Sequence, residues 1–442
     1  MNDLLAAIKD KLTAAGKSAA DIGLPAVIAL DFGAARGLAD FVRQSGYDKL
    51  VLVTDPSCLE AAGQAVLPVL KQAGIPSSTV ILHPNAAGDV VADEASVVQV
   101  LLEIQRQSAD ACVALGSGTV HDIVRYAAYT SRIPFLSVPT APSVDGFTSK
   151  GAPLIIRGDK ITVPAVGPAA IFADLDILSA APAAMVAAGF GDMLGKYTSL
   201  FDWRFGSLTT GEPFDPFVCE MTERALTSCV NNADEIGRCT PEGVAVLMQA
   251  LIESGIAMLI LGQSHPASGA EHHLSHYWEM DFIRTGRRQL LHGAKVGVAC
   301  AIIADTYKRI ADEGLPWTGD QEQARDRIQT EKHVRDQAPA QDSGHALLRD
   351  QPNPGSISAP HAAIEAAIAH WPTILRMIAA LPDAQTIRSL LRTVHGPVDI
   401  AGLGIDSSLR DRALQEADNV RPGRTTLLRV YNTALRERIK AQ

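Results

Sequence analysis

The feature that most limits the possible folds is an alternation of short apolar strands and amphipathic helices in the first part of the chain. Five runs dominated by Val, Ile, Leu and Ala alternate with segments of helical periodicity, and they cover residues 25–30, 49–56, 78–83, 111–115 and 134–139. Strands without polar alternation are typical of a parallel sheet that helices cover on both faces. We therefore predict an open α/β sheet in this part of the chain.

Two further strand signals end this alternation. Residues 153–156 and 160–163 flank Arg157-Gly158-Asp159 and predict a hairpin, and residues 170–174 predict a last strand. Beyond about Ser179 only helical periodicity remains, in residues 181–203, 217–231, 241–261, 293–311, 361–381, 384–394 and 424–440. We predict an α/β domain over residues 1–178 and an all-helical domain over residues 179–442, in which the polar segment 318–360 forms an exposed insertion.

Composition narrows the class of protein. A hydrophobic share of 47% and a charged share of 20% are those of an ordinary soluble globular protein. A net charge of −10 argues against a nucleic-acid partner, which needs clustered Lys and Arg. Residues 1–12 form an amphipathic helix and not a signal peptide, and the apolar stretch 177–191 is too short to span a membrane and contains Pro182. We expect no membrane span.

The six cysteines are scattered, with no Cys-x-x-Cys pair. This spacing fits neither a zinc cage nor a disulfide framework. We predict small buried thiols in a protein of the reducing cytoplasm.

One loop of the predicted sheet is suited to a dinucleotide. The strand at 111–115 is followed by Gly116-Ser117-Gly118-Thr119-Val120-His121-Asp122, which opens a helix. Free backbone N–H groups at a helix N-terminus suit a pyrophosphate. The usual dinucleotide fingerprint requires a third glycine where this chain has His121, and Gly-Ser-Gly also makes ordinary turns. The loop can therefore be either a dinucleotide-binding loop or an ordinary turn.

The next loop along the sheet, residues 140–149, adds hydroxyl groups and Asp145 to the same edge. Asp55 follows the second strand, where a carboxylate can accept from an adenosine ribose and disfavours a 2′-phosphate. This favours NAD over NADP, although Asp at a strand end is also a common turn former.

Three segments of the helical part carry residues that can bind a metal. Asp192 is the only acidic residue between positions 177 and 200, within Gly189-Phe190-Gly191-Asp192-Met193-Leu194-Gly195-Lys196. Further on come Glu271-His272-His273-Leu274-Ser275-His276 and Leu291-His292-Gly293. They predict a divalent ion held by one carboxylate and two imidazoles, and three protein ligands with an open position are typical of catalytic sites.

The individual histidines allow different roles. His272 and His276 are four residues apart and share one face of a helix, so both can bind the ion, or one can bind it while the other meets the substrate. His273 points elsewhere and is expected at the surface or behind the ligands. His292, at the start of an apolar helix, can also be a helix cap or a core histidine.

The longer motifs resemble those of a known family. Residues 116–122, 137–149, 188–196 and 268–272 are similar to the sn-glycerol-1-phosphate dehydrogenases, which belong with the iron-containing alcohol dehydrogenases, glycerol dehydrogenases and dehydroquinate synthases. The chain length and the tail Val420-Arg421-Pro422-Gly423-Arg424-Thr425-Thr426-Leu427-Leu428 resemble the bacterial branch. The resemblance covers residues 20–310 well and the tail more loosely.

The resemblance implies a dehydroquinate synthase-like fold, with an N-terminal Rossmann-like domain, a C-terminal all-helical domain and a cleft between them. Carried over residue by residue, it implies Asp192, His272 and His292 as metal ligands and Asp145 and His276 as catalytic substrate contacts. It implies dinucleotide contacts at Asp55, Gly118, Thr119, Val120, His121, Asp122, Thr140, Ala141, Pro142, Ser143 and Ser149. The expected cofactors are NAD(H), with NADP(H) as the alternative, and one divalent ion, either nickel or zinc, with iron as a third candidate.

The expected reaction is the reduction of dihydroxyacetone phosphate to sn-glycerol 1-phosphate with NAD(P)H. The ion would polarise the ketone, and His276 or a metal-held water would supply the proton. Lys196, one helical turn after Asp192, is a candidate partner for the substrate phosphate, although a lysine there can simply be solvated. The alternatives are a glycerol or other polyol dehydrogenase, a dehydroquinate synthase-like lyase and, least favoured, a non-catalytic nucleotide- or metal-binding module. We also expect a homodimer.

Overall fold

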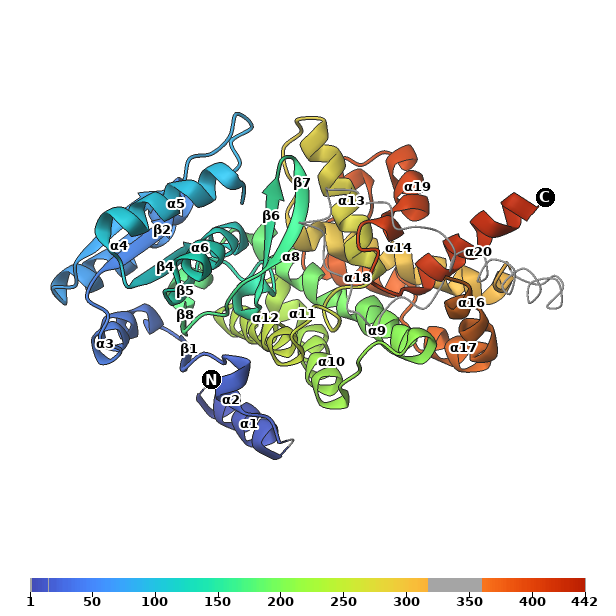
Figure 1. Ribbon diagram of the computed structural model, residues 1–442, viewed down its shortest axis with the longest axis horizontal. Helices are drawn as coiled ribbons and strands as arrows, with labels where there is room; N and C mark the ends of the chain where they lie inside the picture. The colour runs from blue at the N-terminus through green and yellow to red at the C-terminus, as the bar shows by residue number, and fades with distance from the viewer. Residues whose placement is uncertain (1, 15, 317–359, 442) are drawn as a thin grey trace, which may run out of the picture.

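The core of the N-terminal part is a parallel sheet. The structure is a computed structural model that describes residues 2–14, 16–316 and 360–441. Its sheet has six strands in the order β1-β8-β5-β4-β2-β3, and every neighbouring pair is parallel (Figure 1). The strands are β1 (Val27–Asp31), β2 (Leu50–Thr54), β3 (Ser77–Ile81), β4 (Ala111–Gly116), β5 (Phe135–Pro139) and β8 (Ala170–Asp174). The predicted parallel sheet is confirmed.

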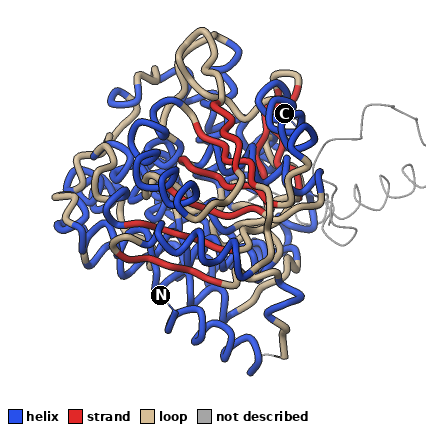
Figure 2. The backbone as a smooth tube through the Cα atoms, turned by 90° about the vertical axis from the view of Figure 1, so that its left-hand side faces the viewer, coloured by secondary structure: helices blue, strands red, loops and turns tan. Residues whose placement is uncertain are grey.

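Helices cover both faces of this sheet, as the apolar strands predict (Figure 2). Successive side chains of β2 and β4 point to opposite faces: Val51 and Val53 join one hydrophobic cluster, and Leu50 and Leu52 join the other. The first cluster includes side chains of α5 (Glu94–Gln107) and α6 (Gly118–Ser131). The second includes side chains of α3 (Gly37–Gln44) and α4 (Pro56–Gln72). The four inner strands are buried along their whole length.

The predicted hairpin is also confirmed. It consists of β6 (Gly151–Ile156) and β7 (Asp159–Pro164), which pair in antiparallel register. Its two loop residues, Arg157 and Gly158, both have positive φ, of 53° and 84°, as a tight two-residue hairpin turn requires. The hairpin stands between the sheet and the helical part, because β6 packs against α5 and α6 while β7 packs against α13 (Figure 1).

After β8 the described residues form helices and no strand. The longer ones are α8 (Ala183–Leu194), α9 (Lys196–Thr210), α10 (Pro216–Asn231), α12 (Pro241–Leu261), α13 (Ala270–Arg284), α14 (His292–Glu313), α16 (Pro360–Ala369), α17 (Trp371–Ala379), α18 (Ala384–Thr393), α19 (Ser407–Glu416) and α20 (Leu427–Ala441). Nearly all of the predicted insertion, 318–360, lies outside the described residues.

Two predicted helices are in fact helix pairs. The periodicity at 181–203 continues through Gly195, but the helix is interrupted there between α8 and α9. Likewise, 361–381 divides at His370 into α16 and α17. Gly195 lies where a side chain of α14 approaches, since a Cβ added there would lie 2.6 Å from Val296. An apolar pattern does not reveal such an interruption, because both halves are buried.

Helix α12 alone among the described single helices is long and apolar enough to cross a membrane. Of its most apolar window, 72% is buried inside the protein, as expected for a core helix. Its side chains Leu247, Leu251 and Ile256 belong to the main hydrophobic cluster of the helical part. The six cysteines are free thiols, and five of them are buried, as predicted.

The backbones of α8 and α14 touch where the two helices cross. A Cβ added to Gly293 would lie 1.8 Å from the carbonyl oxygen of Ala188, and one added to Gly191 would lie 2.4 Å from that of Gly293. Only glycine fits such an approach. The crossing places Asp192 of α8 beside His292, the first residue of α14.

This crossing leads to a prediction about stability. We expect Gly293→Ala to lower the free energy of unfolding by about 1–3 kcal/mol, because the new methyl group forces two backbones apart. Gly423→Ala is the matched control, since its Cβ meets open space at an ordinary φ. Denaturant unfolding curves compare the two; equal midpoints would show that the close crossing is not required.

Candidate metal centre and active site

A cavity of about 940 Å³ connects the loops of the sheet with the helical part. Its wall includes Gly118 and Ser149 from the sheet side, Lys160 from the hairpin, and His276 and His292 from the helices. Side chains from both predicted domains therefore meet around one space. This is the geometry in which two ligands can be brought into contact.

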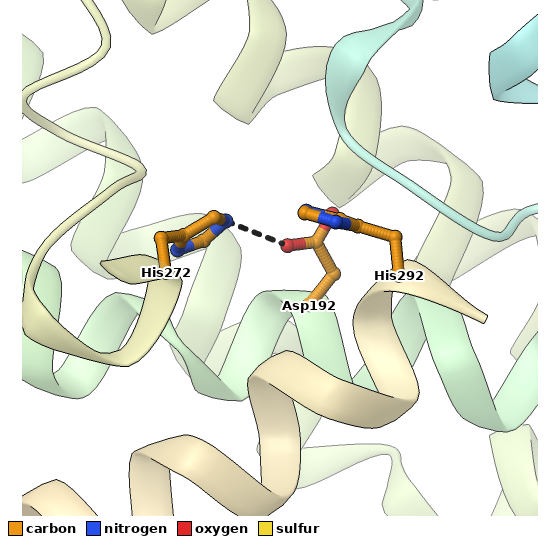
Figure 3. Close-up of side chains that lie close together, drawn as sticks. All are labelled: Asp192, His272 and His292. Atoms are coloured by element: carbon orange, nitrogen blue, oxygen red, sulfur yellow. Dashed lines mark ion pairs between the residues drawn. The ribbon is translucent and has the colours of Figure 1, made fainter. Parts of the chain in front are cut away.

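Three side chains from three helices converge at one end of this cavity (Figure 3). Asp192 comes from α8, His272 from the first turn of α13 and His292 from the start of α14. One potential ligand atom of each lies within 4.8 Å of the others, and His272 Nε2 is 3.6 Å from Asp192 Oδ1. Ligands about 2.0–2.2 Å from a common ion have such separations. Asp192 is fully buried behind the cavity wall, to which both histidines contribute.

A neighbouring carboxylate orients His272. Glu271 Oε1 accepts a hydrogen bond from His272 Nδ1 at 2.7 Å, which leaves Nε2 with its lone pair toward Asp192 and His292. Glu271 is itself held by the hydroxyl group of Thr198 and the backbone N–H of Gly269. Metal-bound histidines commonly have such a carboxylate partner. This role of Glu271 was not predicted from the sequence, although its place directly before a candidate ligand histidine was a usable signal.

The protonation states suit a cation. Burial is the largest cause that holds the pKa values of His272 and His292 well below their usual range, so both rings are neutral and can bind a metal. Burial and the neighbouring Asp145 raise the pKa of Asp192 to about 7. A divalent cation would favour the ionised carboxylate. The residues present therefore fit a divalent ion.

Lys196 contacts two carboxylates of this site and does not line the cavity. Its ammonium group is fully buried, 2.7 Å from Asp145 Oδ2 and 3.3 Å from Asp192 Oδ1. The hypothesis that Lys196 binds the substrate phosphate is therefore wrong, because its charge is already used to neutralise two carboxylates. The predicted helical spacing to Asp192 is correct. Asp145 is further held by the hydroxyl group of Ser254, and its N–H donates to Asp192 Oδ2.

His276 lies one helical turn after His272 and faces the same cavity. With Glu279 and His292 it forms a second group whose ligand atoms lie within 4.8 Å of one another. Glu279, however, already makes ion pairs with Lys160 at 2.7 Å and Lys295 at 3.0 Å. Lys160 and Lys295 together outweigh the charge of Glu279, whereas Lys196 only partly offsets the charges of Asp145 and Asp192. The group around Asp192 therefore suits a metal ion better.

The expectation that His273 is near the surface is wrong. Its side chain is completely buried, and burial lowers its pKa to about 3. Nor does it support the ligands by a hydrogen bond, since neither ring nitrogen has a partner among the described residues.

The expected dinucleotide residues fall into two groups. Those that line the cavity are Asp55, Gly118, Thr119, Asp122, Ser143 and Ser149; those that do not are Val120, His121, Thr140, Ala141 and Pro142. His121 is buried and bonded to Ser137 Oγ at 2.7 Å and to the carbonyl oxygen of Ser117 at 2.9 Å. Its ring thus belongs to the core of the loop.

Asp55 has a structural role as a helix cap. Its Oδ1 accepts from Cys58 N at 2.8 Å and caps α4, while the residue also lines the cavity. Ser57 and Ser117 also line the cavity and were not among the predicted contacts. Both are hydroxyl residues next to predicted contacts, which was the available signal.

The chain is similar to known proteins over most of its length. Residues 29–182 match the family model described as iron-containing alcohol dehydrogenase. The glycerol-1-phosphate dehydrogenase (NAD(P)+) of Geobacillus stearothermophilus is 43% identical over 396 residues, which are 89% of this chain and 89% of that protein. The protein of the same name from Bacillus subtilis (strain 168) is 46% identical over 71% of this chain and 80% of its own length. The chain belongs to the glycerol-1-phosphate dehydrogenase family.

Solved structures extend this family relation to the fold. A probable glycerol dehydrogenase from Sinorhizobium meliloti 1021 superposes with a TM-score of 0.62 at 14% identity, over 94% of this chain and 96% of that one. An NADH-dependent butanol dehydrogenase from Thermotoga maritima gives a TM-score of 0.60, over 93% and 97%. The predicted fold class, an α/β part followed by an all-helical part, is confirmed, and so is the resemblance to the glycerol-1-phosphate dehydrogenases.

The Glu271–His272 contact leads to a prediction about metal affinity. We expect Glu271→Gln to weaken binding of a divalent ion by about 10–100-fold, because the amide no longer holds the His272 ring with a negative charge. Glu253→Gln is the control, since Glu253 is also a buried carboxylate but is bonded to Gln249 on α12. Competition with a chromophoric chelator measures both; equal affinities would contradict the role of Glu271.

Proposed function

We propose that this chain reduces dihydroxyacetone phosphate to sn-glycerol 1-phosphate with NAD(P)H. The observation that supports it most is the group of Asp192, His272 and His292 at the end of a cavity, in a chain that matches proteins of that name over most of its length. The cavity also contains the loop at Gly118, where a helix begins and a dinucleotide phosphate can bind.

Asp192, His272 and His292 would hold the divalent ion, which supplies Lewis-acid polarisation of the substrate ketone when bound. The remaining steps belong to the side chains of this chain. Asp145, fixed by Lys196 and Ser254, presents one carboxylate beside the reacting centre. His276 faces the same space, and we propose that it delivers the proton to the oxygen atom that was the ketone.

Burial keeps the pKa of His276 well below its usual range, and the positive charges of Lys160 and Arg421 act in the same direction. His276 is therefore neutral at pH 7, with one ring N–H group to donate. A neutral imidazole that lost its N–H proton alone would become an imidazolate, so the other ring nitrogen must take up a proton from water as the first nitrogen gives its proton. The ring thus serves as a relay.

We propose nickel or zinc for the ion, with iron as a third candidate, because one carboxylate and two imidazoles suit all of them. We also propose two domains, 1–178 and 179–442, with the cavity between them, and a homodimer in the cytoplasm. The free, mostly buried thiols support a reducing compartment.

The reaction is tested by NADH oxidation with dihydroxyacetone phosphate. We expect activity that a chelator abolishes and a divalent ion restores. Asp192→Asn should lower turnover at least about 100-fold, since several kcal/mol of transition-state stabilisation depend on the ion. It should still bind NADH, and added metal should not rescue it.

The chelated wild-type protein is the matched control, because it lacks the ion but keeps Asp192. Fluorescence of bound NADH shows that both forms retain the cofactor. Full activity of Asp192→Asn would refute the site. Activity with dihydroxyacetone but none with its phosphate would refute the substrate.

A second prediction concerns the choice of nucleotide. We expect Asp55→Ala to shift the preference toward NADPH by about 10-fold, because a carboxylate that binds a ribose hydroxyl and repels a 2′-phosphate is lost. Asp93→Ala is the matched control, since Asp93 caps α5 in the same way, at 2.9 Å from Ser96 N, but does not line the cavity.

Both variants should lose about 1 kcal/mol of stability, as expected for a lost helix cap. The ratio of kcat/KM for NADH and NADPH measures the preference. An unchanged ratio in Asp55→Ala would leave Asp55 with the capping role alone.

A further inference from the structure

The cavity contains more positive charge than its nearest carboxylate can neutralise. Lys160 and Lys295 both contact Glu279 Oε2, at 2.7 and 3.0 Å. Two positive charges and one negative charge leave this group with a formal charge of +1. The side chains of Lys160 and Lys295 are only 12% and 2% exposed, so water screens this surplus poorly. Asp122, which also lies near Lys160, is paired with Arg125 at 2.8 Å.

Arg421 brings a third cation to the same wall from the C-terminal tail. Its Nη1 donates to Ser264 Oγ at 3.0 Å and Ser268 Oγ at 3.1 Å, and its Nη2 lies 3.5 Å from Thr162 Oγ1. These hydroxyl groups hold the planar guanidinium group in one orientation. Ser268 is in the loop that leads into α13, four residues before His272.

The hairpin brings Lys160 close to Arg421. Lys160 and Thr162 are two residues apart on β7, so their side chains lie on the same face of the strand. Since Thr162 meets Arg421, Lys160 and Arg421 border one region of the cavity. This explains why the hairpin stands between the sheet and α13: it carries a charged side chain from the N-terminal part toward the metal centre.

This region lies next to the reacting centre. Lys160 contacts the carboxylate of Glu279. One ligand atom of Glu279 lies within 4.8 Å of a ring nitrogen of His276 and of one of His292, so Glu279 is a neighbour both of Lys160 and of the two rings. Lys196, which is buried and neutralised by Asp145 and Asp192, has no part in it.

We infer that Lys160 and Arg421 form the subsite for the phosphate group of the substrate. A phosphate monoester carries a charge of about −1.5 to −2 at pH 7 and offers three acceptor oxygens. The guanidinium of Arg421 suits bidentate binding, and the ammonium of Lys160 acts as a point charge on the other side. This inference rests on the proposed function, and it assigns the specificity for a phosphorylated three-carbon substrate to these two side chains.

The test compares phosphorylated and unphosphorylated substrates. We expect Lys160→Met and Arg421→Lys each to lower kcat/KM for dihydroxyacetone phosphate at least about 10-fold, mostly through KM. KM for NADH should stay unchanged, and kcat/KM for dihydroxyacetone, which has no phosphate to bind, should fall much less than kcat/KM for dihydroxyacetone phosphate. Lys160→Met leaves Glu279 paired with Lys295. Arg421→Lys keeps the positive charge but loses the two parallel N–H donors of the guanidinium group.

Arg288→Ala is the matched control. Arg288 also lines the cavity, but its side chain is 78% exposed and pairs with Asp89 at 3.2 Å. Removing this rim charge should leave KM for dihydroxyacetone phosphate as in the wild type. If both test variants keep the wild-type KM for dihydroxyacetone phosphate, or lose affinity for NADH instead, the inference is wrong.

Calorimetric titration of the metal-loaded protein with inorganic phosphate gives a readout without turnover. The wild type and Arg288→Ala should bind phosphate, and both test variants should bind it at least about 10-fold more weakly. If wild-type protein fails to oxidise NADH with dihydroxyacetone phosphate, the proposed function fails, and this titration still decides the subsite. Equal phosphate affinity in all four proteins would overturn the subsite itself.

Discussion

The site depends on the crossing of α8 and α14, where glycines allow two helix backbones to touch. Asp192 and His292 are 100 residues apart in the chain, and they meet only because Gly191 and Gly293 leave no side chain between the helices. The third proposed ligand, His272, is placed by α13, whose first N–H group, that of Ala270, is held by the buried carboxylate of Asp202. The proposed metal centre is therefore set by packed helices and not by loops, which gives the precise geometry that a metal ion requires.

The electrostatics of the site follow from burial. Lys196 neutralises part of the negative charge of Asp145 and Asp192, while His272 and His292 remain neutral. Further out the charge becomes positive, at Lys160, Lys295 and Arg421. The cavity thus separates a place for a cation from a place for an anion. Such an arrangement orients a substrate that has a carbonyl oxygen at one end and a phosphate at the other.

Much of this structure could be predicted from the sequence, and the remainder has a physical reason. The strands and the hairpin were predictable because burial on both faces leaves uninterrupted Val and Ile, and because Arg157-Gly158 suits a tight turn. The interruption of the helix at Gly195 was not predictable, since apolar periodicity continues through it. Lys196 was misjudged because one of its partners, Asp145, comes from a distant loop. A role for Arg421 could not be predicted, because it depends on the contact of the C-terminal tail with Thr162 and Ser268, which no local sequence pattern reveals.

The most direct test of this account is the anomalous scattering of a crystal of the protein loaded with nickel or zinc. We predict one strong peak at about 2.0–2.2 Å from a carboxylate oxygen of Asp192 and from one ring nitrogen each of His272 and His292. A peak between His276 and Glu279, or no peak between the three helices in a crystal that contains the metal, would contradict the account.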